Sequence, residues 1–232
     1  MKIALLGYGK MGKEIEKLSK KRGHEIVAII DKNFSEGNML NADVSINFSV
    51  PDAAEKNILQ SLKLNIPVVS GTTGWLDDLH KITDFCKKSN GAFLYSSNFS
   101  IGVNVFFKIN DILSKLMNDF SDYKASIEET HHSKKLDRPS GTAITLAEKI
   151  ISNSNYQSWT LKENKLNELP IKVKRKGDVK GQHVVKYNSS IDSIKIEHDA
   201  KSREGFALGS IIASEWIIGK TGVFSLKDVL KI

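Results

Sequence analysis

The sequence predicts an α/β protein built in two parts, and three observations carry that prediction. In the first hundred residues, short apolar runs alternate with amphipathic stretches, the pattern of a parallel sheet with helical crossovers. From about residue 101 the order changes to helix, strand, helix and then three strand-like runs, which predicts an α+β part with an open mixed sheet. With 232 residues, the chain is long enough for one and a half to two domains and a sizeable core.

The elements of the first part follow from its apolar runs. Strands are predicted at 2–6, 26–30, 44–48, 67–69 and 92–95, with helices around 12–21, 53–63 and 77–88 between them. Ligands of such sheets bind beyond the carboxyl ends of the strands. We therefore expect contacts from the loops that follow three of the strands: Phe48-Ser49, Gly71-Thr72-Thr73-Gly74 and Ser96-Ser97-Asn98-Phe99.

The second part begins with a predicted helix at 104–117, a strand at 124–129 and a helix at 141–152. The polar stretch 157–168 is expected to be a loop. The remaining elements are strands at 171–176, 183–188 and 193–199, a helix at 206–218, and a short helix at 225–232 that packs back on the first part.

A glycine motif, Gly7-Tyr8-Gly9-Lys10-Met11-Gly12, follows the first strand and opens the first helix. Its first glycine allows a tight turn, the second lets a pyrophosphate approach the backbone, and the third lets helix and strand pack closely. The second strand ends in Asp31, 19 residues beyond Gly12, where a carboxylate can bind an adenosine ribose. Strand, motif, helix and acid together predict a Rossmann-like dinucleotide-binding domain.

Lys32 follows Asp31 directly and widens the choice of dinucleotide. An acid at the strand end favours NAD, whereas a neighbouring cation can pair with the 2′-phosphate of NADP. Because lysine is a mobile point charge, it does not exclude the unphosphorylated ribose. We expect both NADH and NADPH to be used.

Composition narrows the possible partners. The net charge of +7 comes from scattered lysines without an aromatic stacking platform, so we expect no nucleic-acid partner and instead a basic surface that attracts small anions. The first apolar run is only five residues long, so we expect no signal peptide and no membrane partner. The single cysteine, Cys86, excludes an intrachain disulfide and is expected to be a small buried residue. These features indicate the reducing cytoplasm.

The segment 129–143, with the sequence ETHHSKKLDRPSGTA, holds the densest chemistry of the chain. A histidine pair alone is more often a strand end or an adventitious metal site, and Pro-Ser-Gly-Thr alone is an ordinary turn with a helix N-cap. Here His131 and His132 can donate protons near neutral pH, and the amides at Ser140-Gly141-Thr142 can form an anion pocket with Lys135. Together they predict a site that binds a small carboxylate and supplies a proton.

The motifs resemble those of the 4-hydroxy-tetrahydrodipicolinate reductase, or dihydrodipicolinate reductase, family of the diaminopimelate route to lysine. The similarity covers nearly the whole chain, and the histidine-to-threonine segment is highly specific to that family. The matching motifs are the glycine loop, Gly71-Thr72-Thr73-Gly74, residues 97–104, His131-His132-x-x-Lys135-x-Asp137-x-Pro139-Ser140-Gly141-Thr142-Ala143, Gly177-Asp178-Val179-x-Gly181-x-His183 and Ser202-Arg203.

The resemblance implies an NAD(P)H-dependent enzyme that reduces 4-hydroxy-tetrahydrodipicolinate, a small dicarboxylate, to tetrahydrodipicolinate with loss of water. It implies a dinucleotide-binding domain formed by 1–100 together with 204–232, and a substrate-binding and tetramerisation domain at 101–203. The expected assembly is a homotetramer.

Site residues carry over by position in the same way. The resemblance implies that His131 is the acid/base and Lys135 a second proton donor. It implies that substrate carboxylates are held by His132, Ser140, Gly141 and Thr142. The implied cofactor contacts are Gly7, Tyr8, Gly9, Lys10, Met11, Gly12, Asp31, Lys32, Phe48, Gly71, Thr72, Thr73, Ser96, Ser97, Asn98 and Phe99.

Two residues depart from the family pattern, and the chain is also short after the second strand. Arg138 occupies a position that is most often a small alanine, Val50 one that is arginine in some members, and few residues separate Asp31 from the strand at 44. None of these removes a catalytic position.

Three other functions compete with this interpretation. Another Rossmann oxidoreductase of amino or imino dicarboxylates, such as an aspartate dehydrogenase, would not need the full histidine-to-threonine segment. A nucleotide sensor without catalysis would lose the proton donors. A metal hydrolase built on the histidine pair would need an acid at ligand spacing, which we do not find, so we expect no metal.

Overall fold

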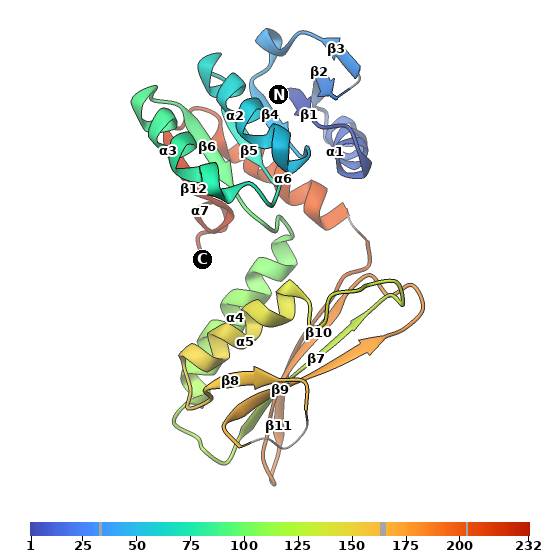
Figure 1. Cartoon of the computed structure of the whole chain (residues 1–232), viewed down its shortest axis with the longest axis vertical. Helices are drawn as coiled ribbons and strands as arrows, with labels where there is room; N and C mark the ends of the chain where they lie inside the picture. The colour runs from blue at the N-terminus through green and yellow to red at the C-terminus, as the bar shows by residue number, and fades with distance from the viewer. Residues whose placement is uncertain (33, 163–165, 203) are drawn as a thin grey trace. The chain divides into compact units, whose positions relative to one another are not determined.

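The computed structural model describes residues 1–32, 34–162, 166–202 and 204–232. The chain divides into two compact units (Figure 1): unit 1 comprises Met1–Ile101 with Glu204–Ile232, and unit 2 comprises Gly102–Arg203. Arg203 of the Ser202-Arg203 motif lies outside the described residues. Within the described ranges, no helix combines the length and apolar character needed to cross a membrane.

Unit 1 is built on a twisted, mostly parallel sheet. Among the described residues its strand order is β12-β6-β5-β4-β1-β2-β3, and β3 alone in this order runs antiparallel to its neighbour. The order reverses between β1 and β4, which is where ligands bind on sheets of this kind. The strands are β1 (Lys2–Leu6), β2 (Glu25–Asp31), β3 (Phe34–Gly37), β4 (Val44–Asn47), β5 (Val68–Ser70), β6 (Ala92–Tyr95) and β12 (Gly222–Ser225).

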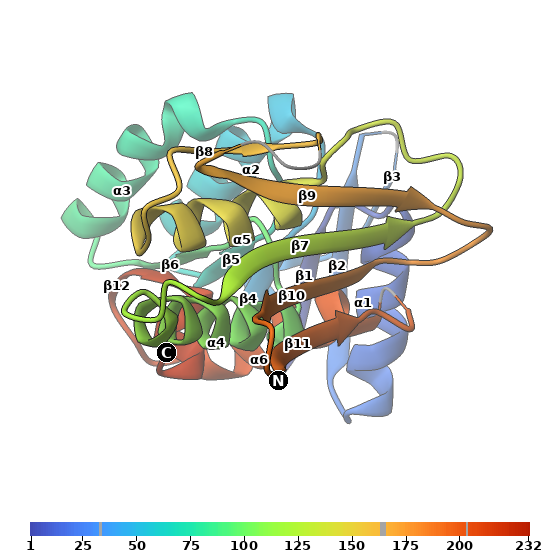
Figure 2. The same ribbon diagram turned by 90° about the horizontal axis from the view of Figure 1, so that it is seen from below.

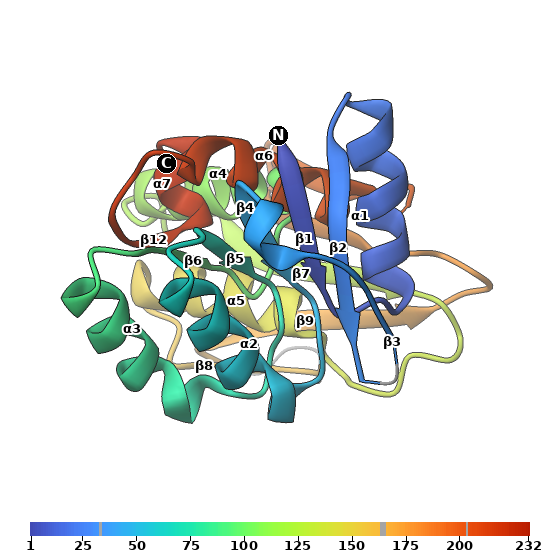
Figure 3. The ribbon, with the colours of Figure 1, turned by 90° about the horizontal axis from the view of Figure 1, so that it is seen from above.

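Helices cover both faces of this sheet (Figure 3). On one face Ile15 of α1 and Ile211 of α6 pack with Leu5 and Ile46, and on the other Ile58 of α2 packs with α3. Apolar residues on both faces explain the continuous apolar run of β1, whereas the neighbouring β4 also carries the buried polar residues Ser45 and Asn47. The helices of unit 1 are α1 (Lys10–Lys21), α2 (Pro51–Lys63), α3 (Leu79–Lys88), α6 (Glu204–Ile217) and α7 (Leu226–Leu230), with short 3₁₀ helices at Met39–Asn41 and Leu76–Asp78.

The five strands and the helices expected in unit 1 are confirmed, with differences at their ends. Helix α1 begins at Lys10, so the last three residues of the glycine motif belong to its first turn and not to a loop. Two edge strands were missed because neither contains a buried apolar run: β3 (sequence FSEG), which is exposed throughout and pairs with β2, and β12 (sequence GVFS), which is half-buried and pairs with β6. Cys86 is fully buried, as expected.

Unit 2 has a mixed sheet with two helices on one face (Figure 2). In the described residues its strand order is β11-β10-β7-β9-β8, with β7 parallel to β9 and antiparallel to β10. Apolar residues of α4 and α5 pack on the sheet through Phe106, Leu146 and Ile127. The elements are α4 (Ile101–Met117), β7 (Lys124–His131), α5 (Gly141–Ser152), β8 (Ser158–Thr160), β9 (Glu168–Arg175), β10 (Gln182–Asn188) and β11 (Ser193–Asp199).

The predicted α+β part with an open mixed sheet is confirmed, but the loop expected at 157–168 is wrong in part. Ser158–Thr160 forms β8, which pairs in parallel with the start of β9. Residues 163–165 of that stretch lie outside the described residues. A strand of three residues has no detectable period, and its pairing with β9, the next strand in the chain, stabilises it.

Candidate active site

The glycine motif of unit 1 packs as its spacing requires. Gly7 has φ +96°, and a Cβ there would lie 2.3 Å from the carbonyl oxygen of Phe48. A Cβ on Gly12 would lie 2.4 Å from the carbonyl oxygen of Gly7. Neither distance is possible for a real side chain, so the first glycine permits the turn and the third permits the contact of helix and strand.

Gly9 lies where a bound anion would approach. A Cβ on this glycine would meet no described atom within 4 Å, so the space above it is open. Gly9 is also the N-cap of α1 and offers no side-chain acceptor to the amides of the first turn, including those of Met11 and Gly12. Unpaired amides at a helix start bind phosphate well. These residues therefore fit the pyrophosphate of a dinucleotide.

Asp31 lies at the carboxyl end of β2 with its carboxylate oriented by the motif. Its Oδ2 accepts a hydrogen bond from the Tyr8 amide at 2.9 Å, and its Oδ1 accepts one from the Lys32 amide at 2.7 Å. Asp31 and Lys32 are both exposed, so each can reach a bound ribose and its 2′ substituent. The hydroxyl of Tyr8 bonds to Glu16, which turns the ring toward α1.

The other predicted cofactor residues differ in what their side chains can contact. Thr73 and Ser97 are exposed, whereas Thr72 is buried and its Oγ1 accepts a hydrogen bond from the Ser49 amide at 2.9 Å. Phe99 is 1% exposed and packs on the ring of Phe48, so only its backbone could touch a ligand. The remaining members lie partly exposed at strand ends: Phe48, Gly71, Ser96 and Asn98.

In unit 2, the core faces of the three central strands end in ionisable residues on the same side of the sheet. Along β7, Ile127 of the apolar core is followed on the same face by Glu129 and His131. Strand pairing sets His183 of β10 opposite Glu129, and Arg175 of β9 opposite His131. All four side chains are at least nine-tenths buried.

Glu129 is the centre of this cluster. Its Oε1 accepts a hydrogen bond from Arg175 Nη1 at 3.0 Å, and its Oε2 accepts one from the Ser140 amide at 3.0 Å. Burial opposes ionisation of the carboxyl group, but hydrogen bonds from Ser140 and Arg175 outweigh it and hold the pKa of Glu129 below its usual range. A carboxylate is therefore present inside the unit at neutral pH.

Two imidazoles flank this carboxylate. His131 Nδ1 lies 3.8 Å and His183 Nε2 lies 3.7 Å from Glu129 Oε2, and the two rings meet edge to face with centroids 5.0 Å apart. Burial lowers the pKa of His131, an effect that Glu129 opposes and that Lys135 and Arg175 reinforce. Burial and the neighbouring His131 lower the pKa of His183 to about 4, so His183 is neutral at physiological pH.

The predicted carboxylate pocket lies where α5 begins. Ser140 is the N-cap, and its Oγ accepts a hydrogen bond from the Ala143 amide at 3.3 Å and lies 3.1 Å from His183 Nε2. A Cβ on Gly141 would meet no described atom within 4 Å, so the first turn of the helix faces open space. Thr142 is half-buried beside it. The amides of Gly141 and Thr142 can therefore receive an anion, whereas the amide of Ser140, predicted for the same pocket, already donates to Glu129.

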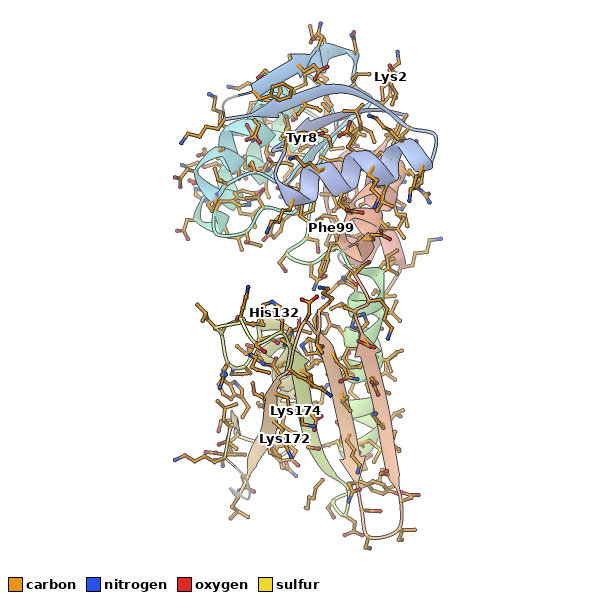
Figure 4. The ribbon with its side chains drawn as sticks, turned by 90° about the vertical axis from the view of Figure 1, so that its right-hand side faces the viewer. Lys2, Tyr8, Phe99, His132, Lys172 and Lys174 are labelled. Carbon is orange, nitrogen blue, oxygen red and sulfur yellow. The ribbon has the colours of Figure 1, made fainter. Side chains whose placement is uncertain are left out.

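Lys135 and His132 lie on the segment that joins β7 to α5. Lys135 Nζ forms an ion pair with Asp137 at 2.8 Å, and this ammonium holds the pKa of the Asp137 carboxyl below its usual range. His132 is half-buried and follows the end of β7 (Figure 4). Arg138 and Val50, the two departures from the family pattern, are both exposed.

The sequence indicated no acid at a convincing ligand spacing from the histidine pair, but the structure places Glu129 beside His131. Glu129, His131 and His183 offer three ligand atoms that all lie within 4.8 Å of one another. The histidine that completes this group is His183, not the adjacent His132. However, the guanidinium of Arg175 is 3.0 Å from the Glu129 carboxylate. A fixed positive charge so close disfavours a second cation, and these residues fit a proton-handling cluster better than a metal site.

Sequence reasoning assigned no role to Glu129, Arg175 or His183. The alternation along each strand could have indicated all three, because each residue lies on the strand face that carries the buried residues. Which of these polar strand ends meet depends on the pairing register, and a single sequence does not contain it.

A dinucleotide-binding sheet and a cluster of buried proton donors define the class of the protein as a dinucleotide-dependent oxidoreductase. Family models narrow this class: the model of the dihydrodipicolinate reductase N-terminus matches residues 1–99, and that of the dihydrodipicolinate reductase C-terminus matches residues 102–230. The chain belongs to the dihydrodipicolinate reductase family.

Reductases of this family are similar to the chain over nearly their full lengths. The chain is 54% identical to the 4-hydroxy-tetrahydrodipicolinate reductase of Christiangramia forsetii, covering 99% of this chain and 98% of the relative. It is 35% identical to that of Thermosipho africanus, covering 100% and 98%. A dipicolinate-bound dihydrodipicolinate reductase from Paenisporosarcina has the same fold, with a TM-score of 0.81 at 21% identity and 98% of each chain covered.

Proposed function

We propose that this protein reduces 4-hydroxy-tetrahydrodipicolinate to tetrahydrodipicolinate with NADH or NADPH and loss of water, in lysine biosynthesis through diaminopimelate. The observation that carries the proposal is the buried His131 and the nearby Lys135 beside the open first turn of α5. Family membership and the reductases named above support the same reaction.

Elimination of the 4-hydroxyl together with a hydrogen of the neighbouring ring carbon would release water, and the conjugated ring that remains then needs one hydride and one proton. When bound, the dihydronicotinamide supplies the hydride to ring carbon 4. His131 then supplies the proton that the electron-rich ring requires, and it is suited to this because burial makes its imidazolium a stronger acid than a free one. A dianionic substrate beside His131 favours the protonated ring before the transfer and so opposes the effect of burial.

Lys135 has two uses in this mechanism. Its ammonium, now paired with Asp137, can turn to a substrate carboxylate and can act as a second proton donor. The amides of Gly141 and Thr142 complement the same carboxylate, and the positive end of α5 adds to the attraction. Ser140 and His132 complete the proposed carboxylate contacts.

We also propose the cofactor contacts. The amides of Gly9 to Gly12 would hold the pyrophosphate, and Asp31 would bind the adenosine ribose. Because Lys32 is exposed beside Asp31, it can pair with a 2′-phosphate without blocking NADH, which supports the use of both cofactors. Gly71 to Thr73 and Ser96 to Phe99, at neighbouring strand ends, would complete the nucleotide site.

We further propose a cytoplasmic homotetramer assembled through unit 2. The family resemblance supports this assembly, and the single cysteine, which is buried and free, is compatible with a reducing compartment. Light scattering coupled to size-exclusion chromatography would test the tetramer directly.

The test of the activity is an assay in which hydroxy-tetrahydrodipicolinate is generated freshly and the oxidation of NADH or NADPH is followed by absorbance. We expect turnover with both cofactors and competitive inhibition by pyridine-2,6-dicarboxylate. Absence of turnover with either cofactor, in a protein that still binds NADH, would refute the proposed reaction.

A further inference from the structure

The segment between β7 and α5, residues 132–140, carries Lys135 without any helix or strand of its own. Its backbone is tied by a turn from the Lys135 amide to the His132 carbonyl at 3.1 Å, and by a bond from the Ser133 amide to the Gly177 carbonyl at 3.1 Å. A group that donates a proton must be held close to its productive position. Support from neighbouring elements is therefore needed.

Arg175 supplies such support from β9. Its Nε donates to the carbonyl oxygen of Lys135 at 3.2 Å, and its Nη2 donates to the carbonyl oxygen of Asp137 at 2.5 Å. The side chain is 7% exposed, and its bond to the Lys135 carbonyl is partly buried. A guanidinium holds its donors in one rigid plane, whereas the three donors of an ammonium group rotate freely. Arg175 thereby holds the backbone on both sides of residue 136.

Glu129 holds the same guanidinium through an ion pair. This carboxylate is completely buried, and besides Arg175 it binds the amide of Ser140, the residue that caps α5. The pair thus contacts the segment at two places, around Lys135 and at its junction with α5. A shift of Arg175 or Glu129 would be transmitted to the proposed proton donor and to the proposed carboxylate pocket.

Stability alone does not account for the pair. The free-energy cost of removing two charges from water offsets most of the energy gained from their attraction. A protein with apolar residues of similar size at such buried positions is often equally stable. The same two strands contain such an apolar pair, because Ile127 of β7 lies opposite Ile171 of β9 and both pack in the core. The guanidinium donates to four oxygens, of which two, the carbonyls of Lys135 and Asp137, belong to the segment. This arrangement indicates that the pair fixes the geometry of the segment.

We propose that Arg175 and Glu129 are positioning residues that act through Lys135, holding its segment for proton donation and carboxylate binding. The inference rests on the proposed function. It predicts that Arg175→Lys, which keeps the charge next to Glu129 but loses the planar set of donors, lowers kcat by about 10-fold or more while the Kd for NADH stays within about twofold.

A double-mutant cycle gives the decisive measurement, because residues that act as one unit have non-additive effects. We expect Arg175→Lys combined with Lys135→Ala to be no slower than Lys135→Ala alone. Losses that multiply in the double variant would show that Arg175 does not act through Lys135 and would overturn the proposal. Wild-type kcat in Arg175→Lys would overturn it as well.

The matched control is Lys174→Met. Lys174 precedes Arg175 on β9 and pairs with Glu128, which precedes Glu129 on β7, but this pair is on the exposed face (Figure 4). Its loss should leave kcat, KM and the melting temperature close to wild type. A loss of kcat equal to that of Arg175→Lys would show a general effect of charge on this strand and contradict the proposal.

A second variant protects the test from a folding defect. If Arg175→Lys lacks the cooperative melting of the wild type, Glu129→Gln combined with Arg175→Gln, which removes the two opposite charges beside His131 together, goes through the same cycle with Lys135→Ala. Multiplicative losses there would equally overturn the proposal. If the wild type is active and the losses of kcat multiply in the double variant, only the positioning role is refuted. If the wild type is inactive, the proposed function and this inference are refuted together.

Discussion

Two glycines at two helix starts allow the nucleotide site and the carboxylate site to be tested against each other. Gly9 precedes α1 in unit 1 and Gly141 begins α5 in unit 2, and a methyl group at either position would meet no described atom within 4 Å. Neither has a positive φ, so alanine should fold at both positions without strain. Each methyl would instead occupy the space that an anion needs.

The expected magnitude follows from the contacts that would be lost. A hydrogen bond to a charged group contributes about 1.5–3 kcal/mol, so one displaced oxygen weakens binding about 10- to 150-fold. Gly141→Ala should raise the Kd of pyridine-2,6-dicarboxylate and the KM of the substrate by this factor, with kcat changed less because the carboxylate does not react. Gly9→Ala should weaken NADH by a similar factor and leave the dicarboxylate unaffected at saturating NADH.

Isothermal titration calorimetry on both variants checks this crossed pattern. Binding of the dicarboxylate is measured with NADH in excess, and melting temperatures confirm that both variants are folded. Unaltered dicarboxylate affinity in Gly141→Ala would place the carboxylate elsewhere. Equal losses of both ligands in both variants would mean that the substitutions disturb folding and not the two separate sites.

The remaining predictions concern protons, cofactor choice and acid stability. His131→Ala and Lys135→Ala should each lower kcat by about 100-fold or more with NADH affinity nearly unchanged, and stopped-flow or steady-state kinetics with wild-type kcat in either variant would contradict the assignment. Lys32→Ala should weaken NADPH relative to NADH by about 1 kcal/mol, whereas equal weakening in titrations would exclude a phosphate contact. The pKa of His183 is about 4 in the folded protein and about 6.5 in the unfolded chain. Between these two pH values the unfolded chain binds one proton more than the folded protein. Stability should therefore drop as the pH falls from about 6.5 toward 4, by at most about 3 kcal/mol. Urea unfolding should show a flatter pH dependence in His183→Gln over this range, and an unchanged slope would refute the contribution of His183.

Much of the fold could be predicted because its signals are local. Strand β1, the glycine motif and α1 form one continuous pattern, and helix α5 has its predicted bounds because Ser140 caps it and its apolar residues repeat with the helical period. The short strands β3, β8 and β12 carry no such pattern. Their stability comes from partners elsewhere in the chain, so a propensity argument does not detect them.

The candidate site also has one part that could be predicted from the sequence and one part that could not. His131, Lys135 and Ser140 to Thr142 are close in sequence, and one motif indicates them all. Arg175 and His183 follow His131 by 44 and 52 residues, and they reach the cluster only through the pairing of β9 and β10 with β7. Burial of these two side chains depends on that pairing, and no local pattern shows which buried strand ends will meet.

The register of the second sheet has a consequence for how this enzyme can change during evolution. His131 lies opposite Arg175 and Glu129 lies opposite His183, so backbone ladders of β7, β9 and β10 align the ionisable groups. Side chains alternate between the faces of a strand, and a single inserted or deleted residue in any of the three strands would move one of these groups to the opposite face. Length changes should therefore be tolerated in the turns between strands but not within them, and new specificities should arise by substitution in the segment after β7, where the backbone is not part of a ladder.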